Sequence, residues 1–204
     1  MINIAVLVSG GGTNLQALID AQKAGTLKSG RIALVVSSRP EARALTRAGD
    51  ASIETAVLEK AETPEAYGER LIALLKAHRI DMAVLAGFML ILHSNVILAY
   101  EGRILNVHPS LIPAFCGSGY YGLKVHKAAL DAGVKVTGAT VHIVNEIPDG
   151  GKILAQKAVK VKRKDTPETL QKRVMEKAEW VLLPRETEKL ARKLEKKRTK
   201  GKAS

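Results

Sequence analysis

The sequence predicts an α/β protein: a mostly parallel, Rossmann-like three-layer sandwich whose sheet becomes mixed in the C-terminal half. Two observations predict this fold class. In the first half of the chain, short apolar runs alternate with amphipathic helical patterns, which is typical of parallel strands buried on both faces. Later, two strand-like runs joined by a loop with one proline and two glycines follow each other directly, which favours an antiparallel pair. The 204 residues are enough for one such domain.

Each element follows from its own pattern of apolar and polar residues. Parallel strands are expected at Asn3–Ser9, Ile32–Ser37, Ile53–Leu58, Met82–Ala86 and Arg103–Val107, and the later pair at Thr137–Val144 and Ile153–Val161. Helices are expected at Asn14–Ala24, Pro40–Ala48, Thr63–His78 and Val125–Ala132. A last helix should begin with Thr166 as its N-cap and Pro167 in its first position. Pro184 should end or kink that helix.

Positive charge is concentrated at the C-terminal end of the chain. The net charge is +12, and much of the excess lies in residues 189–202. We predict one catalytic domain, residues 1–188, followed by a basic and flexible tail, residues 189–204. Aromatic residues make up only 3% of the chain, so no stacking platform for RNA is apparent and no nucleic-acid partner is expected. The remaining positive charge suits small anionic substrates.

Composition and spacing exclude several other classes. No apolar run is long enough to span a membrane, and the first residues are expected to form a strand rather than a signal peptide. Cys116 is the only cysteine, so no intrachain disulfide can form, and a cytoplasmic location fits. No spacing of histidines, cysteines or carboxylates indicates a metal site, so no metal is predicted.

The segment Asn106–Pro113 is the most informative part of the sequence. Residues i and i+2 of an extended strand point the same way, so Asn106 and His108 face one common point. An amide N–H and a protonatable ring aimed together can stabilise a developing oxyanion and serve a departing amine. Pro109 and Pro113 stiffen the exit from the strand. The alternative is a strand end and stiff turn in which His108 is only a hydrogen-bonded structural residue.

A glycine-rich segment, Ser9–Asn14, connects the first strand to the first helix. Open α/β sheets bind ligands at this edge, where glycines allow close approach and the helix start offers free N–H groups. The segment lacks both the ending of a nucleoside-triphosphate loop and the glycine spacing of a dinucleotide site. It therefore predicts a site for a single phosphate at Gly11, Gly12, Thr13 and Asn14. A plain tight turn is the alternative.

A carboxylate and a second histidine follow in the C-terminal half. Asp149 stands in a loop that Pro148 and two glycines bend sharply, from which it could reach His108, hold its orientation and favour its charged form. Spacing alone does not establish that contact, since Asp-Gly pairs also occur simply as turns. His142 lies on a predicted strand and is taken as a supporting residue.

The segment Val84–Leu92 is too apolar for an ordinary exposed connection. It leaves the fourth predicted strand through Gly87 and continues through Met89, Leu90, Ile91 and Leu92. Such a loop could line a slot for a flat heteroaromatic ligand, with backbone groups reading the ring edge. A loop that is simply part of the core is the alternative.

Taken together, these segments resemble the phosphoribosylglycinamide formyltransferases, a folate-dependent family of purine synthesis. The resemblance covers about residues 1–181 and rests on motifs that occur in the same order. They are Ser9–Gln16, Leu85–Met89, Asn106–Pro113, and Thr140–Val144 with Asp149-Gly150-Gly151. The third motif alone is less specific, because other enzymes that use 10-formyltetrahydrofolate resemble the family there.

The resemblance implies a formyltransferase fold and a reaction. The formyl group of 10-formyltetrahydrofolate, a co-substrate, passes to the amine of 5-phosphoribosyl-glycinamide in de novo purine biosynthesis, giving formylglycinamide ribonucleotide and tetrahydrofolate. Asn106 and protonated His108 would stabilise the oxyanion, Asp149 would keep His108 charged, and the glycine-rich segment would hold the substrate phosphate. The implied folate-binding residues are Met89, Leu90, Ile91, Leu92, Asn106, Val144 and Asn145. The expected partners are these two small molecules, with no membrane, and both monomer and homodimer stay open.

The sequence departs from the family pattern at two positions and leaves rival functions to weigh. Leu90 and Pro64 stand where some members carry arginine. Methionyl-tRNA formyltransferases have a further C-terminal domain, and formyltetrahydrofolate deformylases usually have an additional N-terminal domain, neither of which is expected here. A rival of another class is a non-catalytic RNA-binding module that uses the basic tail.

Overall fold

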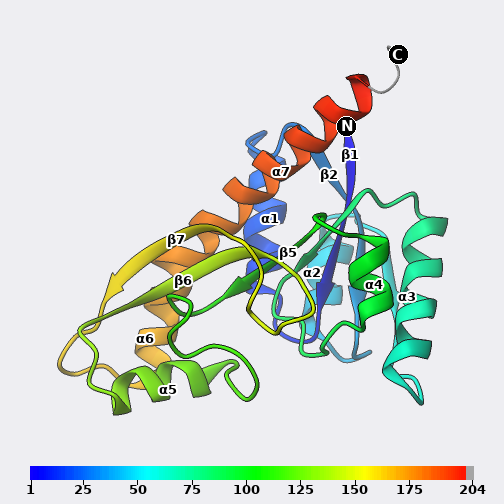
Figure 1. Ribbon diagram of the computed structural model, residues 1–204. Coiled ribbons are helices and arrows are strands. Elements are labelled where there is room, and N and C mark those ends of the chain that lie inside the picture. The colour runs from blue at the N-terminus through cyan, green and yellow to red at the C-terminus, as the bar shows by residue number, and fades with distance from the viewer. Residues whose placement is uncertain (201–204) are drawn as a thin grey trace.

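The computed structural model describes residues 1–200, which form a seven-stranded sheet with helices on both faces (Figure 1). The strands are β1 (Ile2–Val8), β2 (Gly30–Ser37), β3 (Thr55–Val57), β4 (Met82–Leu85), β5 (Ile104–His108), β6 (Val136–Ile143) and β7 (Ile153–Lys160). Their order in the sheet is β3-β2-β1-β4-β5-β6-β7. Neighbours from β3 to β5 are parallel, whereas β6 is antiparallel to both β5 and β7. The predicted mixed α/β sheet is confirmed.

Alternating side chains of the central strands supply two separate apolar cores. On β1, Ile4, Val6 and Val8 belong to one core, and Ala5 and Leu7 belong to the other. The helices are α1 (Thr13–Lys23), α2 (Arg43–Asp50), α3 (Pro64–Ala77), α4 (Ser94–Ala99), α5 (Leu123–Asp131), α6 (Pro167–Val174), a π-helical turn η1 (Met175–Glu179) and α7 (Trp180–Lys200). Helices α1, α2, α6 and α7 pack on the first core, and α3 and α4 pack on the second. Because both sets of alternating side chains are buried, each central strand is a nearly continuous run of apolar residues.

The helices agree with the sequence except at three places, the last of which is the C-terminal helix described below. Thr166 caps α6 as predicted, with Pro167 in the first position and a reciprocal hydrogen bond between Thr166 and Thr169. The predicted helix at Pro40–Ala48 begins later, at Arg43. The short helix α4 was not predicted, because its six residues are too few to show a helical period.

The C-terminal helix differs most from the expectation. Pro184 neither ends nor breaks it, since α7 continues through this residue to Lys200. A proline inside a helix costs on the order of 3 kcal/mol, which the burial of Leu183, Leu190 and Ala191 against the sheet offsets. Residues 189–200 are therefore helical rather than the flexible tail that the charge pattern predicted, and only residues 201–204 of that segment lie outside the described part of the chain.

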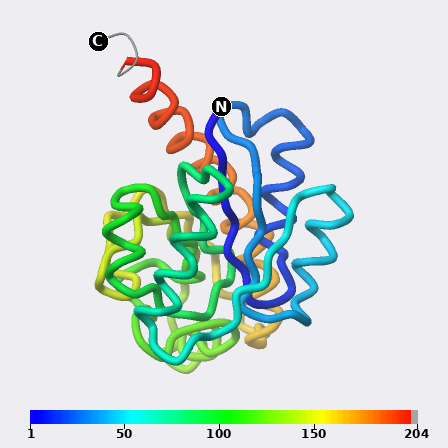
Figure 2. Tube along the Cα trace, turned by 90° about the vertical axis from the view of Figure 1, so that its right-hand side faces the viewer, coloured from blue at the N-terminus to red at the C-terminus, as the bar shows by residue number. Residues whose placement is uncertain are grey.

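The end of α7 extends past the sheet, next to the N-terminus of the chain (Figure 2). Polar contacts connect the two, because the amino group of Met1 pairs with Glu195 and Arg198 donates to the Met1 carbonyl. Within residues 1–200, no helix is both long and apolar enough to cross a membrane.

Candidate active site

A cavity of about 570 Å³ opens where β4 and β5 end, beside β6 and the loop that follows it. We call it the main cavity. Its lining combines the apolar segment after β4, three residues of β5, a glycine-rich loop and the loop after β6. The residues used below are Arg39, Met89, Leu90, Ile91, Leu92, Asn106, His108, Gly117, Tyr120, Tyr121, His142, Val144, Asn145 and Asp149. Ligands of α/β proteins bind at this end of parallel strands.

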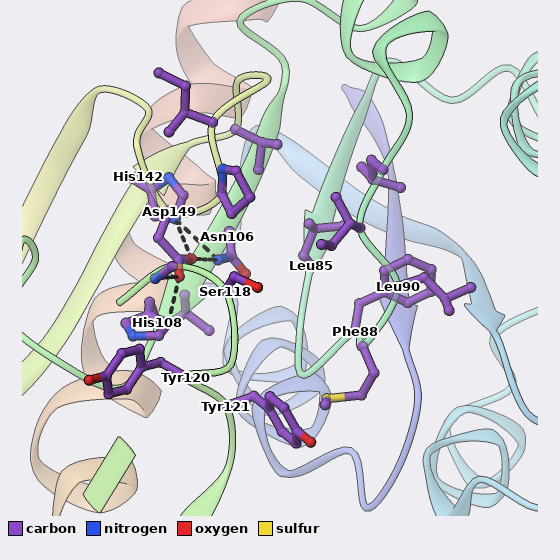
Figure 3. Close-up of a pocket in the computed structure, with 18 of the residues that line it drawn as sticks. Leu85, Phe88, Leu90, Asn106, His108, Ser118, Tyr120, Tyr121, His142 and Asp149 are labelled. Atoms are coloured by element: carbon purple, nitrogen blue, oxygen red, sulfur yellow. Dashed lines mark hydrogen bonds and ion pairs between the residues drawn. The ribbon is translucent and has the colours of Figure 1, made fainter. Parts of the chain in front are cut away.

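Asn106 and His108 lie on β5 and meet Asp149 in the main cavity (Figure 3). The Nδ1 atom of His108 is 3.4 Å from Oδ2 of Asp149, and Asn106 donates its side-chain amide to Oδ1 of Asp149 at 3.3 Å. The structure therefore brings together the three residues predicted to be catalytic. The contact with Asp149, which the sequence left open, is present.

Asp149 also has partners outside β5. The backbone N–H of Gly117 donates to its Oδ2 atom at 2.8 Å. Burial by itself raises the pKa of Asp149, but the His142 and His108 rings and the Gly117 N–H together lower it below the usual value of a carboxyl group. The group is therefore held as a charged carboxylate beside His108.

The other ring nitrogen of His108 contacts a loop residue that the sequence did not single out. Nε2 of His108 donates to the carbonyl oxygen of Phe115 at 2.8 Å, so both nitrogens have an acceptor partner. Phe115 and Gly117 thus contact the site through their backbone atoms. The only signal for them in the sequence is the glycine-rich composition of their loop.

His142 supports Asn106 from the neighbouring strand. The antiparallel register pairs Asn106 with His142 and His108 with Thr140. Asn106 donates to Nε2 of His142 at 3.1 Å, and Nδ1 of His142 donates to the carbonyl of Ile143 at 3.0 Å. These contacts hold the side-chain amide of Asn106 between Asp149 and His142.

Pro109, the second residue predicted to support the site, directly follows His108 at the end of β5. Its neighbour Ser110 is fully buried and donates to the Ala114 carbonyl, while Thr140 of β6 donates to the Ser110 carbonyl at 2.7 Å. The chain after His108 is thus fixed against β6, which is the stiff exit that the prolines predicted.

The glycine-rich loop lies beside the main cavity without lining it. Gly12 adopts a left-handed conformation, with φ of +71°, and precedes α1 with no side-chain cap. The first N–H groups of α1 are consequently free of helical partners, as an anion site requires. The loop adjoins the cavity through Ser9, whose hydroxyl accepts the backbone N–H of Met89 at 2.9 Å.

Helix α2 fixes the shape of this loop. Arg47 donates through Nε to the Gly11 carbonyl at 2.8 Å, and Ala44 donates its N–H to the Gly10 carbonyl at 3.0 Å. In both contacts a carbonyl oxygen of the loop is the acceptor, so the N–H groups at the start of α1 stay available. No motif in the sequence indicated this contribution from Arg47.

The side chain of Asn14 does not face the glycine-rich loop. It is buried and donates to Oε2 of Glu179, in the π-helical turn η1, at 2.7 Å. Burial raises the pKa of Glu179 to about 7, and the hydrogen bond from Asn14 only partly opposes that effect. The contribution of Asn14 to an anion site is therefore its backbone N–H rather than its amide.

The predicted folate segment lines the apolar wall of the main cavity. Met89, Leu90, Ile91 and Leu92 belong to the lining, and Met89 and Ile91 are exposed. Val144 and Asn145 line the cavity from the loop after β6. Figure 3 shows Leu90 and the polar residues of β5 on facing sides of the cavity. Within residues 1–200, no three His, Cys, Asp or Glu side chains are grouped as metal ligands.

The fold and this cavity define an α/β protein with an Asn–His–Asp cluster at the ends of its central strands. A model of the formyl transferase family matches residues 2–186, so the chain belongs to the formyl transferase family. A solved glycinamide ribonucleotide transformylase 1 from Symbiobacterium toebii has a TM-score of 0.88 and 39% identity to it, covering 94% of this chain and 88% of that one.

Two curated relatives are similar in sequence. The chloroplastic phosphoribosylglycinamide formyltransferase of Arabidopsis thaliana is 39% identical over 175 residues, which are 84% of this chain and 60% of that protein. The trifunctional purine biosynthetic protein adenosine-3 of Gallus gallus is 43% identical over 181 residues, which are 86% of this chain and 17% of that protein. The chain thus spans less than two thirds of the length of either relative.

Proposed function

We propose that this protein transfers the formyl group of 10-formyltetrahydrofolate to the amine of 5-phosphoribosyl-glycinamide, in de novo purine biosynthesis. The observation that carries the proposal is the meeting of Asn106, His108 and Asp149 in one cavity with an apolar wall. The solved Symbiobacterium toebii structure and the Arabidopsis thaliana relative support it, because their names give formyl transfer to phosphoribosylglycinamide.

The cluster can perform formyl transfer without a protein nucleophile. The substrate amine attacks the formyl carbon, and negative charge develops on the formyl oxygen. The donors for that oxygen are the side-chain amide of Asn106 and the Nε2–H group of His108. In this structure that Nε2–H group donates to the Phe115 carbonyl. Asp149 stabilises the positive charge on the ring. The proton lost by the attacking nitrogen passes to the leaving nitrogen of the folate, so the enzyme returns to its starting state.

The substrates occupy the two sides of the site in this proposal. The pterin lies along Met89–Leu92 and the loop at Val144 and Asn145, and the phosphate lies on the N–H groups of Gly11–Asn14. The folate is a co-substrate and no metal takes part. The proposed setting is the cytoplasm, the partners are these small molecules, and the oligomeric state stays open between monomer and homodimer.

One assay tests the proposal directly. The purified protein is incubated with the donor analogue 10-formyl-5,8-dideazafolate, and deformylation is followed by absorbance with and without phosphoribosylglycinamide. We expect deformylation only when the amine is present. Equal rates in both cases would identify a hydrolase, and no reaction in either would overturn the proposal.

Gly12→Ala is expected to raise the KM for phosphoribosylglycinamide about tenfold or more and to leave the KM for the formyl donor within twofold. A Cβ at Gly12 would lie 2.7 Å from the Cβ of Ala44, and the φ of +71° disfavours any side chain. The loop must therefore shift, and its N–H groups move with it. Steady-state kinetics with each substrate varied in turn checks this result.

Gly25→Ala is a suitable control. Gly25 has a similar φ of +66° and open space around it, so the two variants share the backbone cost but not the displacement of the loop. If Gly12→Ala raised the KM for the formyl donor more than the KM for the amine substrate, the phosphate would be wrongly placed.

A further inference from the structure

Arg39 is the sole lysine or arginine among the described residues that line the main cavity. No hydrogen bond or ion pair of its guanidinium group is present within residues 1–200. Two carboxylates line the cavity, and neither pairs with Arg39. Asp149 is engaged by His108, Asn106 and Gly117, and Glu146 is exposed with no ion pair to Arg39. The guanidinium group of Arg39 therefore has no carboxylate partner among the described residues.

The backbone of Arg39 is fixed although its charged group is not. Arg39 donates its N–H to the hydroxyl of Ser37 at 3.1 Å, and that hydroxyl donates to the Arg39 carbonyl at 2.7 Å. The next hydroxyl, on Ser38, is 2.7 Å from the hydroxyl of Ser9, which also accepts the N–H of Met89. Arg39 is thus anchored where the glycine-rich loop and the apolar wall of the cavity adjoin.

The sheet sets the distance from Arg39 to the reacting atoms. Arg39 follows β2, and His108 ends β5, with β1 and β4 between these strands. Three strand spacings of about 4.8 Å place the two backbones about 14 Å apart. A group paired with Arg39 must therefore lie at the end of a substrate that is remote from its reacting atom. Both proposed substrates carry their anion there: a phosphate opposite the amine, and a carboxylate opposite the formyl nitrogen.

We propose that Arg39 binds the remote oxyanion of a substrate, a phosphate monoester or a carboxylate, and so sets the affinity for that substrate without taking part in the chemistry. The inference rests on the proposed function. A guanidinium group offers two parallel N–H donors that match either anion, and such charge-assisted hydrogen bonds are among the stronger ones in proteins.

Kinetics of Arg39→Ala, Arg39→Lys and Arg43→Ala tests the proposal. Arg43 is the matched control, because it is exposed, lies four residues away and does not line the cavity. We expect Arg39→Ala to raise one KM about tenfold or more with kcat within twofold of wild type, Arg39→Lys to raise it less, and Arg43→Ala to change neither constant more than twofold. A raised KM for phosphoribosylglycinamide identifies the phosphate, and a raised KM for the formyl donor identifies the carboxylate.

Calorimetric titration separates failure of this proposal from failure of the proposed function. Ribose 5-phosphate supplies the phosphate alone, and folic acid compared with pteroic acid, which lacks the glutamate, isolates the carboxylate. We expect Arg39→Ala to weaken binding of ribose 5-phosphate, or of folic acid but not pteroic acid, relative to Arg43→Ala. This readout holds even if wild type shows no turnover. Constants for Arg39→Ala that match those of Arg43→Ala throughout, or a fall in kcat alone, would overturn the role of Arg39.

Discussion

Replacing His108 with alanine is expected to lower kcat on the order of 10²–10³-fold and to leave both KM values within a few fold of wild type. His108 is almost fully buried, and the contact of its Nδ1 atom with Asp149 orients the ring in the main cavity. A donor that acts mainly in the transition state contributes to kcat rather than to substrate binding. Steady-state kinetics of the purified variant measures both constants.

Two further variants make the His108 result specific. His108→Gln keeps a polar side chain of similar length but carries no positive charge, so we expect it to lose nearly as much activity as His108→Ala. His78→Ala removes a histidine that pairs with Glu54 far from the cavity and should retain wild-type rates. Thermal melting shows whether each variant is folded. A KM that rises as steeply as kcat falls would contradict the assigned role.

Replacing Asp149 with asparagine is expected to lower kcat about 10²-fold and to move the alkaline side of the pH–rate profile to lower pH. The substitution keeps the shape of the side chain but removes the negative charge that stabilises the protonated ring of His108. Rates measured between pH 5 and pH 10 test this, with Asp131→Asn as a control because Asp131 is exposed on α5. A profile of unchanged shape would remove Asp149 from the mechanism.

Asp149→Asn also tests how much the charged carboxylate of Asp149 contributes to the stability of the folded protein. The pKa of Asp149 is lowered in the folded protein, so the folded state holds the charged form more strongly than the unfolded chain does. This contribution is fully present above the unfolded carboxyl pKa of about 3.9 and is lost as the pH falls through the folded value. Asp149→Asn should therefore be less stable than wild type at neutral pH, with the difference shrinking in acid. Denaturant unfolding of wild type and variant, at neutral pH and in acid, measures this difference in the free energy of unfolding.

The sequence by itself determined the fold class and half of the site. Apolar runs alternating with helical patterns predicted the parallel strands, because burial on both faces leaves a signal within a few residues. The period of two along a strand likewise placed Asn106 and His108 on one side of β5. The N-cap at Thr166 was predicted for the same reason, since a cap depends on residues three positions apart.

Features that depend on distant parts of the chain were decided only by the tertiary structure. Asp149 reaches Asn106 across 43 residues, and it does so because β6 pairs antiparallel with β5 and the following loop folds back over the strand ends. The inward turn of Asn14 depends on Glu179, 165 residues away, and the helical path of residues 189–200 depends on packing that the charge pattern conceals. Local periodicity depends only on residues that are close in the sequence, whereas these contacts form only once the sheet has brought its strands together.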